Sequence, residues 1–163
     1  MQSLEKDILA ILEADSRTPI DRIGAMLGIP TERAREEVKK LEDKGLILKY
    51  TAIVNSEEVD ANRVEAIILV KATPQKGEGF DAIAREIAKQ PEVKDLYLVS
   101  GDYDIAVIVE GSSLKNIAHF VSEHISAYGT VHTTTTHFIL KKYKVEGALM
   151  KKEGEAGRLS VQP

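Results

Sequence analysis

The side chains with the clearest chemistry are cations gathered in one short segment near the N-terminus. Six basic residues lie between positions 31 and 49, and they are Arg33, Arg35, Lys39, Lys40, Lys44 and Lys49. Guanidinium and ammonium groups bind phosphate oxygens, and arginine also forms paired hydrogen bonds with guanine in the major groove. Acids lie among these cations, including Glu32, Glu36 and Glu37. The spacing predicts contact with double-stranded DNA through an element of mixed charge.

Two short helices joined by a tight turn are expected to position these cations. Thr18-Pro19, a capping residue followed by proline, starts the first helix, and Gly28 ends it. After a turn of about three residues, the second helix is expected over Thr31 to Lys44, with Gly45 as its C-cap. An amphipathic helix is expected before them, over Ser3 to Ala14. This order is typical of a helix-turn-helix.

The helix-turn-helix assigns different roles to the polar residues of its second helix. The first residues of that helix contact base edges, and neighbouring basic residues contact phosphates. The residues best placed for base contacts are Thr31, Glu32, Arg33 and Arg35, of which Thr31 and the two arginines are the predicted DNA contacts. The predicted phosphate contacts are Lys39, Lys40, Lys44 and Lys49. The segment from Leu46 to Val54 alternates and is rich in Ile, Thr, Tyr and Val, which predicts a strand pair, or wing.

The net charge of this region opposes DNA binding by attraction alone. Residues 1–60 hold nine Lys/Arg and thirteen Asp/Glu, and the whole chain has a formal net charge of −4. One interpretation is a solvated helix whose charges pair internally, for example Glu36 with Lys40. Two others keep DNA as the partner. In the first, the carboxylates accept hydrogen bonds from cytosine amino groups in the major groove. In the second, each copy binds DNA weakly and an oligomer binds it tightly through avidity. We favour the second.

A second apolar pattern begins after a polar, acidic stretch. Residues 56–62 are predicted to be a linker between a domain over 1–55 and another over 63–144. The later domain follows the order strand, helix, strand, strand, helix, strand, which predicts a ferredoxin-like βαββαβ fold. The fold class is therefore α+β, with a winged helix-turn-helix followed by a ferredoxin-like domain. Residues 145–163 are predicted to be a tail that is either disordered or adds a strand to a partner subunit's sheet, and we favour the added strand.

Two strings stand where this domain order would place them. They are KGLILKYTAIVN at residues 44–55 and LVSGDYDIAVIV at residues 98–109. With them the chain closely resembles the Lrp/AsnC family, the leucine- and asparagine-responsive regulators of bacteria and archaea, from roughly Leu4 to Lys144. The resemblance implies a transcription regulator that forms dimers and higher assemblies, often octamers, and whose C-terminal domain senses an amino acid. Family members usually carry basic residues where this chain has Glu36 and Glu37.

The resemblance also implies an effector site between neighbouring dimers, near a turn and the last strand. An amino acid needs hydrogen-bond donors for its carboxylate and an acidic or carbonyl acceptor for its ammonium. Gly101 lets backbone N–H groups approach, and Asp102 or Asp104 supplies the acceptor. The full predicted set is Leu98, Gly101, Asp102, Asp104, Thr134, Thr136, His137 and Phe138. The alternative is purely structural, a tight hairpin turn and an exposed threonine-rich strand.

Other functional classes find little support in the composition. The chain has no cysteine, which excludes disulfides, zinc fingers and thiol catalysis, and its four histidines lack a metal-ligand spacing. We expect no metal, no cofactor and no enzymatic activity. The N-terminus lacks signal-peptide features and no stretch approaches a membrane span, which predicts a cytoplasmic protein without a membrane partner. Two alternatives stay open, an architectural DNA-wrapping protein and an enzyme similar to sirohaem decarboxylases.

Overall fold

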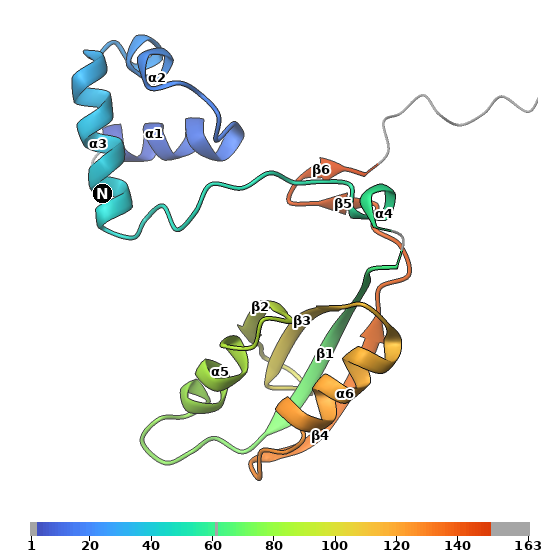
Figure 1. Ribbon diagram of the computed structural model, residues 1–163. Helices are drawn as coiled ribbons and strands as arrows, with labels where there is room; N and C mark the ends of the chain where they lie inside the picture. Colours follow the sequence, from blue (N-terminus) through green and yellow to red (C-terminus); the bar gives the residue numbers. More distant parts are fainter. Residues whose placement is uncertain (1–2, 61, 151–163) are drawn as a thin grey trace, which may run out of the picture. The chain divides into compact units, whose positions relative to one another are not determined.

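The computed structural model describes residues 3–60 and 62–150, which form two compact units (Figure 1). The first unit ends at Ile53 and the second begins at Val54. Each unit has a separate cluster of buried apolar side chains. In the described part of the chain, no helix is long and apolar enough to cross a bilayer.

The first unit consists of three helices, which are α1 (Ser3–Ala14), α2 (Ile20–Leu27) and α3 (Thr31–Asp43). Their buried side chains are Ile8, Leu12, Ile23, Ala34, Val38 and Leu41. Gly28 follows α2 at φ 65°, a left-handed conformation that glycine adopts without strain. A Cβ atom on Gly24 would lie 2.9 Å from the carbonyl oxygen of Ile29, so the turn between α2 and α3 is closely packed. The predicted helix-turn-helix is confirmed.

The segment after α3 differs from the prediction. Gly45 caps the helix with φ 65°, but the described chain forms no strand between Leu46 and Val54, so the predicted strand pair is wrong. A strand needs a neighbour that takes its backbone hydrogen bonds, and the first unit supplies none. Most apolar side chains of this segment are also uncovered, and Leu48 keeps 88% of its surface exposed, whereas Ile47 packs against the core of the first unit. One side-chain contact ties the segment to α3, where the Tyr50 hydroxyl donates to Glu42 over 2.8 Å.

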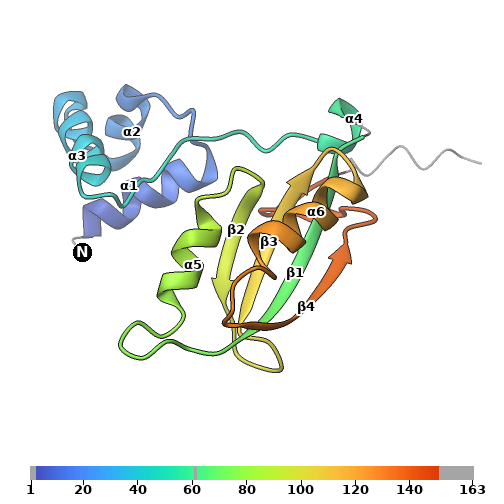
Figure 2. The ribbon, with the colours of Figure 1, turned by 60° about the horizontal axis from the view of Figure 1, so that its bottom comes forward.

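The main body of the second unit is a four-stranded antiparallel sheet with two helices (Figure 2). In chain order the elements are β1 (Val64–Ala72), α5 (Asp81–Ala88), β2 (Val93–Leu98), β3 (Ile105–Gly111), α6 (Leu114–His124) and β4 (Val131–Phe138). The strands lie in the order β2-β3-β1-β4, and all neighbours are antiparallel. Ser113 caps α6, because its hydroxyl accepts from the Asn116 backbone N–H over 3.1 Å. The predicted ferredoxin-like fold is confirmed.

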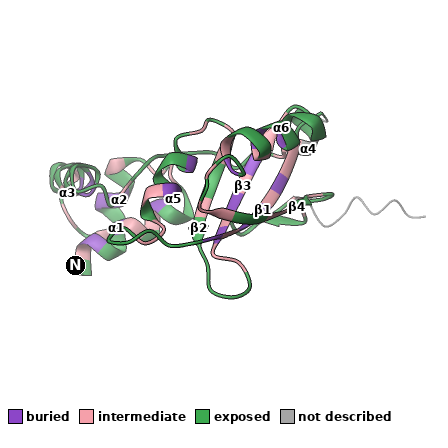
Figure 3. Ribbon diagram, turned by 90° about the horizontal axis from the view of Figure 1, so that it is seen from below, coloured by how far each residue is buried: buried purple, intermediate pink, exposed green. Residues whose placement is uncertain are grey.

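Both helices cover the same face of the sheet. Ala66, Ile68 and Val70 of β1 are fully buried against them, together with alternate residues of β3 (Figure 3). Ile67 and Leu69, the residues between them on β1, therefore point to the opposite face. We call this second face, with Ile67, Leu69 and Ile108 at its centre, the open face of the sheet. Its central residues are only half-buried.

The first and last described segments of the second unit lie close together, outside the main sheet. A short helix, α4 (Ser56–Val59), lies within the stretch that was predicted to be a linker. At the other end β5 (Lys144–Val145) and β6 (Ala148–Leu149) form a hairpin that is separate from the main sheet. The side-chain amide of Asn55 donates to the Met150 carbonyl over 3.3 Å, which joins the two ends. The described start of the predicted tail is thus a hairpin in which β5 pairs with β6 of the same chain. Residues 151–163 lie outside the described chain.

Candidate nucleic-acid interface and effector site

The outer face of α3 has an acidic centre and basic flanks, as the helical period places its residues. Ala34, Val38 and Leu41 point into the core, and each residue turns the helix by about 100°. Glu36 and Asp43 then lie nearly opposite the core. Three cations follow one flank of this face, and they are Arg33, Lys40 and Lys44. Two follow the other flank, and they are Arg35 and Lys39. The acidic and basic side chains of this outer face are therefore separated, with Glu36 and Asp43 along its middle and the cations along its two sides.

Two predicted DNA contacts on α3 already have acidic partners. The Lys40 ammonium lies 2.8 Å from a Glu37 carboxylate oxygen. This hydrogen bond, with the attraction of the same carboxylate, raises the pKa of Lys40. Arg35 lies 3.6 Å from Glu32. These pairs are local and exposed on their basic side, so DNA phosphates can compete for the cations at small cost.

Lys44 has a partner that the sequence did not reveal. Its ammonium lies 2.7 Å from a carboxylate oxygen of Glu5, on α1. Glu5 is only 8% exposed and is the one charged residue among the buried side chains of the described chain. The pair therefore joins the start of α1 to the end of α3. The available signal was position, because Glu5 lies on the same helical stripe as the buried Ile8 and Leu12.

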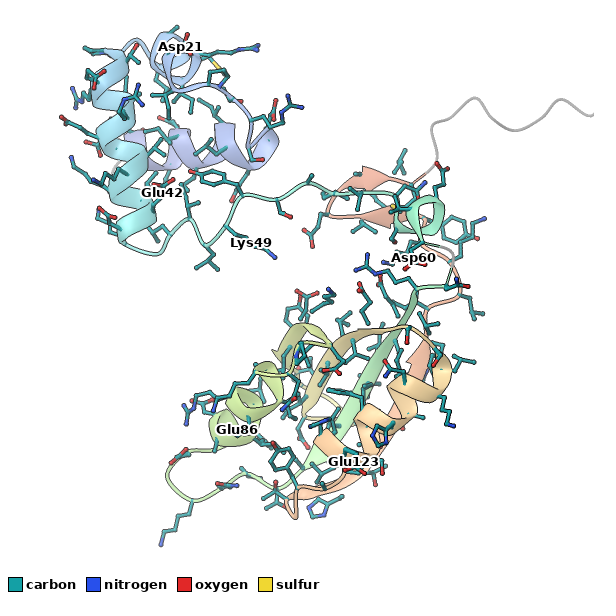
Figure 4. The ribbon with its side chains drawn as sticks, in the orientation of Figure 1. Asp21, Glu42, Lys49, Asp60, Glu86 and Glu123 are labelled. Carbon is teal, nitrogen blue, oxygen red and sulfur yellow. The ribbon has the colours of Figure 1, made fainter. Side chains whose placement is uncertain are left out.

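Three predicted cations are free of such partners. Arg33, Lys39 and Lys49 are exposed and form no ion pair with any described residue. Arg33 and Lys39 flank the acidic centre of α3 by helical geometry. Lys49 lies on the segment that follows the helix (Figure 4). Thr31, the first residue of α3, is half-buried. Among the predicted DNA contacts, these three are the cations that can bind DNA without breaking an internal ion pair.

In the second unit, the turn between β2 and β3 uses its acidic side chains unequally. Gly101 has φ 137°, which only glycine adopts readily. Asp104 accepts from the Ala72 backbone N–H over 2.9 Å and from the Lys71 ammonium over 3.4 Å. The hydrogen bond from Ala72, followed by the contact with Lys71, lowers the pKa of Asp104. Asp104 therefore fastens the turn to the end of β1, whereas Asp102 is exposed at the tip.

The predicted effector residues of β4 do not share one face. Thr134 and Thr136 pair with Val70 and Ile68, so they lie on the face covered by the helices, and Phe138 follows the same alternation. His137 pairs with Ile67 and lies on the open face. Only one of these two groups can line a single pocket. A residue that the prediction missed, Tyr103, crosses to this strand, and its hydroxyl lies 2.7 Å from the Thr135 hydroxyl.

Leu98 lies at the opposite edge of the sheet from β4. It pairs with Ile105 of β3, Ile105 pairs with Val70 of β1, and Val70 pairs with Thr134. Three strand spacings separate Leu98 from Thr134, which is about 14 Å. Two depressions of about 220 and 350 Å³ lie elsewhere on this unit, and no predicted effector residue lines either. One chain therefore does not bring the predicted effector residues together.

Comparison with known families assigns a function to each unit. Residues 1–47 match the model described as winged helix-turn-helix DNA-binding, and residues 65–149 match the Lrp/AsnC ligand binding domain. Fold and comparison together define a transcription regulator with a DNA-binding helix-turn-helix and a separate ligand-binding domain. A Bacillus subtilis protein named as an uncharacterized HTH-type transcriptional regulator, YugG, is 41% identical over 98% of this chain and 96% of its own. The chain belongs to the Lrp/AsnC family.

Solved structures share the fold. The Mycobacterium tuberculosis leucine response regulatory protein has a TM-score of 0.76 at 19% identity, covering 93% of this chain and 100% of its own. A Neisseria meningitidis transcriptional regulator, NMB0573, solved as a complex with L-Met, has a TM-score of 0.68 at 23% identity, covering 89% and 93%. The curated relatives are named as transcription regulators rather than enzymes, so the alternative of a sirohaem-decarboxylase-like enzyme is not supported.

Proposed function

We propose that the protein is a sequence-specific regulator that binds double-stranded DNA through α3 and works as a homo-oligomer. The observation that carries this proposal is the face of α3, where Arg33 and Lys39 are exposed without ion-pair partners in the described chain. They lie on a helix-turn-helix of a DNA-binding family. Because the first unit is acidic, phosphate contacts from one copy give weak binding, and a second copy raises affinity through avidity.

The open face of the sheet is the proposed surface for a second copy. Ile67, Leu69 and Ile108 lie together at its centre, and Tyr97 at its edge is 53% exposed. Apolar side chains on one face of an antiparallel sheet are stabilised by a second layer, and the helices occupy the other face. We propose that two chains pack through this face into a dimer, and that dimers join into a ring of the octamer type.

We propose a free amino acid as the effector, bound between chains. The sheet separates Leu98 from the β4 residues, so a site that contains both needs a second chain. Backbone N–H groups beside Gly101 suit the carboxylate of the ligand, and exposed Asp102 suits its ammonium, since Asp104 is already bonded to β1. The complex of the related Neisseria meningitidis regulator with L-Met supports an amino acid as the class of ligand.

DNA binding is tested by single substitutions of the three free cations. Arg33→Ala, Lys39→Ala and Lys49→Ala should each weaken binding to a duplex selected from a random library. Each lost phosphate contact should also reduce the slope of log K against log salt by about 0.9. The matched control is Lys115→Ala, an exposed cation on α6. Equal losses in all four variants would contradict the assignment of the interface to α3.

Effector binding is tested by thermal-shift screening against the twenty amino acids. A ligand that binds only the native state raises the melting temperature by mass action. The expected result is a shift with one amino acid or a few related ones, which Asp102→Asn removes. Light scattering on the same samples reports the oligomeric state. If light scattering finds a monomer in all conditions, the proposed effector site between chains is refuted. Separately, footprinting that shows continuous protection of all DNA, without phased sites, would favour the architectural alternative.

A further inference from the structure

We infer that Glu36 reads a base, accepting a hydrogen bond from the N4 amino group of cytosine in the major groove. This role rests on the proposed sequence-specific binding and identifies one side chain that supplies the specificity. Glu36 is exposed on the second turn of α3. It lies about 200° around the helix from the buried Ala34, at the centre of the outer face. The N-terminal half of a recognition helix is the part that reaches base edges.

The structure leaves the Glu36 carboxylate without a cation of its own. Lys40, its expected partner four residues on, contacts Glu37 instead over 2.8 Å. The pKa of Lys40 is raised chiefly by Glu37 and only to a smaller extent by Glu36. Arg33 and Lys39, three residues before and after Glu36, form no ion pair with it. Within the described chain Glu36 therefore has no hydrogen bond or salt bridge that would be lost on docking.

A free carboxylate on this face has a narrow choice of favourable partners. An ionised carboxylate only accepts hydrogen bonds, and DNA phosphates repel it. Guanine presents two acceptors in the major groove, and thymine presents an acceptor and a methyl group, so neither gives Glu36 a donor. Adenine places an acceptor beside its amino group. Cytosine presents an amino donor without a neighbouring acceptor, so it is the base that a lone carboxylate favours.

The flanking cations make this contact geometrically reasonable. Arg33 and Lys39 lie about 60° to either side of Glu36 around the helix. Phosphate contacts fix the register of a helix in the groove, while base contacts determine the sequence that is selected. With one cation on each side, the Glu36 carboxylate is directed between the two backbones toward the bases. The charge that weakens binding to DNA in general thereby becomes a source of discrimination among sequences.

The experiment is a selection of duplexes from a random library by the full-length wild type and two variants, Glu36→Gln and Asp43→Asn. Asp43 is the matched control, because it is exposed on nearly the same face but lies at the last residue of α3. Both substitutions remove one negative charge and conserve shape. We expect the wild type to select cytosine at one position of each half-site. Glu36→Gln should lower that preference at least tenfold and admit adenine, which glutamine binds through two hydrogen bonds.

The possible results are separable. A Glu36→Gln motif identical to that of the wild type, at higher affinity for every sequence, would show that Glu36 is only a repelling charge and would overturn the inference. Loss of the cytosine preference in both variants would also overturn it, because the effect would then follow net charge. A wild type that binds DNA without selecting any motif would refute the proposed sequence-specific function itself. Glutamine and glutamate have similar helix propensity, and circular dichroism verifies that α3 is retained.

Discussion

The ion pair between Lys44 and Glu5 makes a prediction that separates stability from DNA binding. Lys44→Met removes the cation 2.7 Å from a carboxylate whose side chain is only 10% exposed. Exposed pairs contribute below about 1 kcal/mol, and removing one partner of a fully buried pair costs about 3–5 kcal/mol. The side chain of Lys44 is 55% exposed, which places this pair between the two limits. We expect the first unit to lose about 1.5 kcal/mol of stability.

The assay is native-state hydrogen exchange of the full chain, which reports the amides of α1 and α3 separately from the second unit. The variants are Lys44→Met, Glu5→Gln and the double substitution, with Lys39→Met as the control for loss of an unpaired cation. The double variant should lose less stability than the sum of the two single losses, by at least about 0.5 kcal/mol. Strictly additive losses would refute the coupling between the two helices.

DNA affinity is measured on the same four variants and on the wild type. If Lys44 also contacts phosphate, Lys44→Met weakens binding by a similar factor in the wild-type and Glu5→Gln backgrounds. If Lys44 only holds α1 against α3, Glu5→Gln weakens binding as much as Lys44→Met does. The Lys39→Met control should lose affinity without loss of stability.

Three further predictions follow from the remaining contacts. Residues 1–60 alone should bind the selected duplex at least tenfold more weakly than the full chain, because they lack the domain that we propose joins several chains into an oligomer. Equal affinity of the fragment and the full chain, with both folded, would contradict this. Partial burial, and then the hydrogen bond with Glu42, raises the pKa of Tyr50 to about 12, so the native contact stabilises the protein below pH 10 and is lost as pH rises toward 12. Ultraviolet titration should show a tyrosine that ionises near pH 12, and Tyr50→Phe should remove that step while the other tyrosines titrate as before. The pKa of Asp104 is lower in the folded protein than in the unfolded chain. The Asp104 carboxylate therefore stabilises the fold above its unfolded-state pKa, and this stabilisation is lost as pH falls through its folded-state pKa. Urea denaturation from pH 6 to pH 2 should show a smaller loss of stability with acid in Asp104→Asn than in Asp102→Asn.

Local signals in the sequence were sufficient for the longer helices and for the succession of helices and strands along the second unit, but not for the short helix α4. Gly28 ends α2 in the left-handed conformation that glycine favours. Ser113 begins α6 as its N-cap, a position that serine favours. The wing was not predictable in the same way, because a strand forms only when another strand accepts its hydrogen bonds. The alternation from Leu46 to Val54 describes side chains that suit a sheet, but the described chain provides no neighbouring strand.

The candidate sites show the same division between local and distant information. Cations on α3 were identifiable from composition and helical period. Their partners were not, because Glu36 and Glu37 are both within reach of Lys40, and side-chain packing decides between them. Asp104 was predicted as a ligand contact from its type, whereas its bond to Ala72 depends on how the turn folds against β1. The separation of Leu98 from Thr134 depends on strand order, which residue types do not encode.

The hydrogen bond from Asn55 to the Met150 carbonyl has a consequence for how the second unit can be reconnected. Because this hydrogen bond brings Asn55 and Met150 together, the described path between them through the second unit is nearly closed. A circular permutant could therefore join these positions through a short linker and open at the exposed loop around Gly77. Such a protein would keep every strand pairing of the sheet, while its two new ends would lie in that loop.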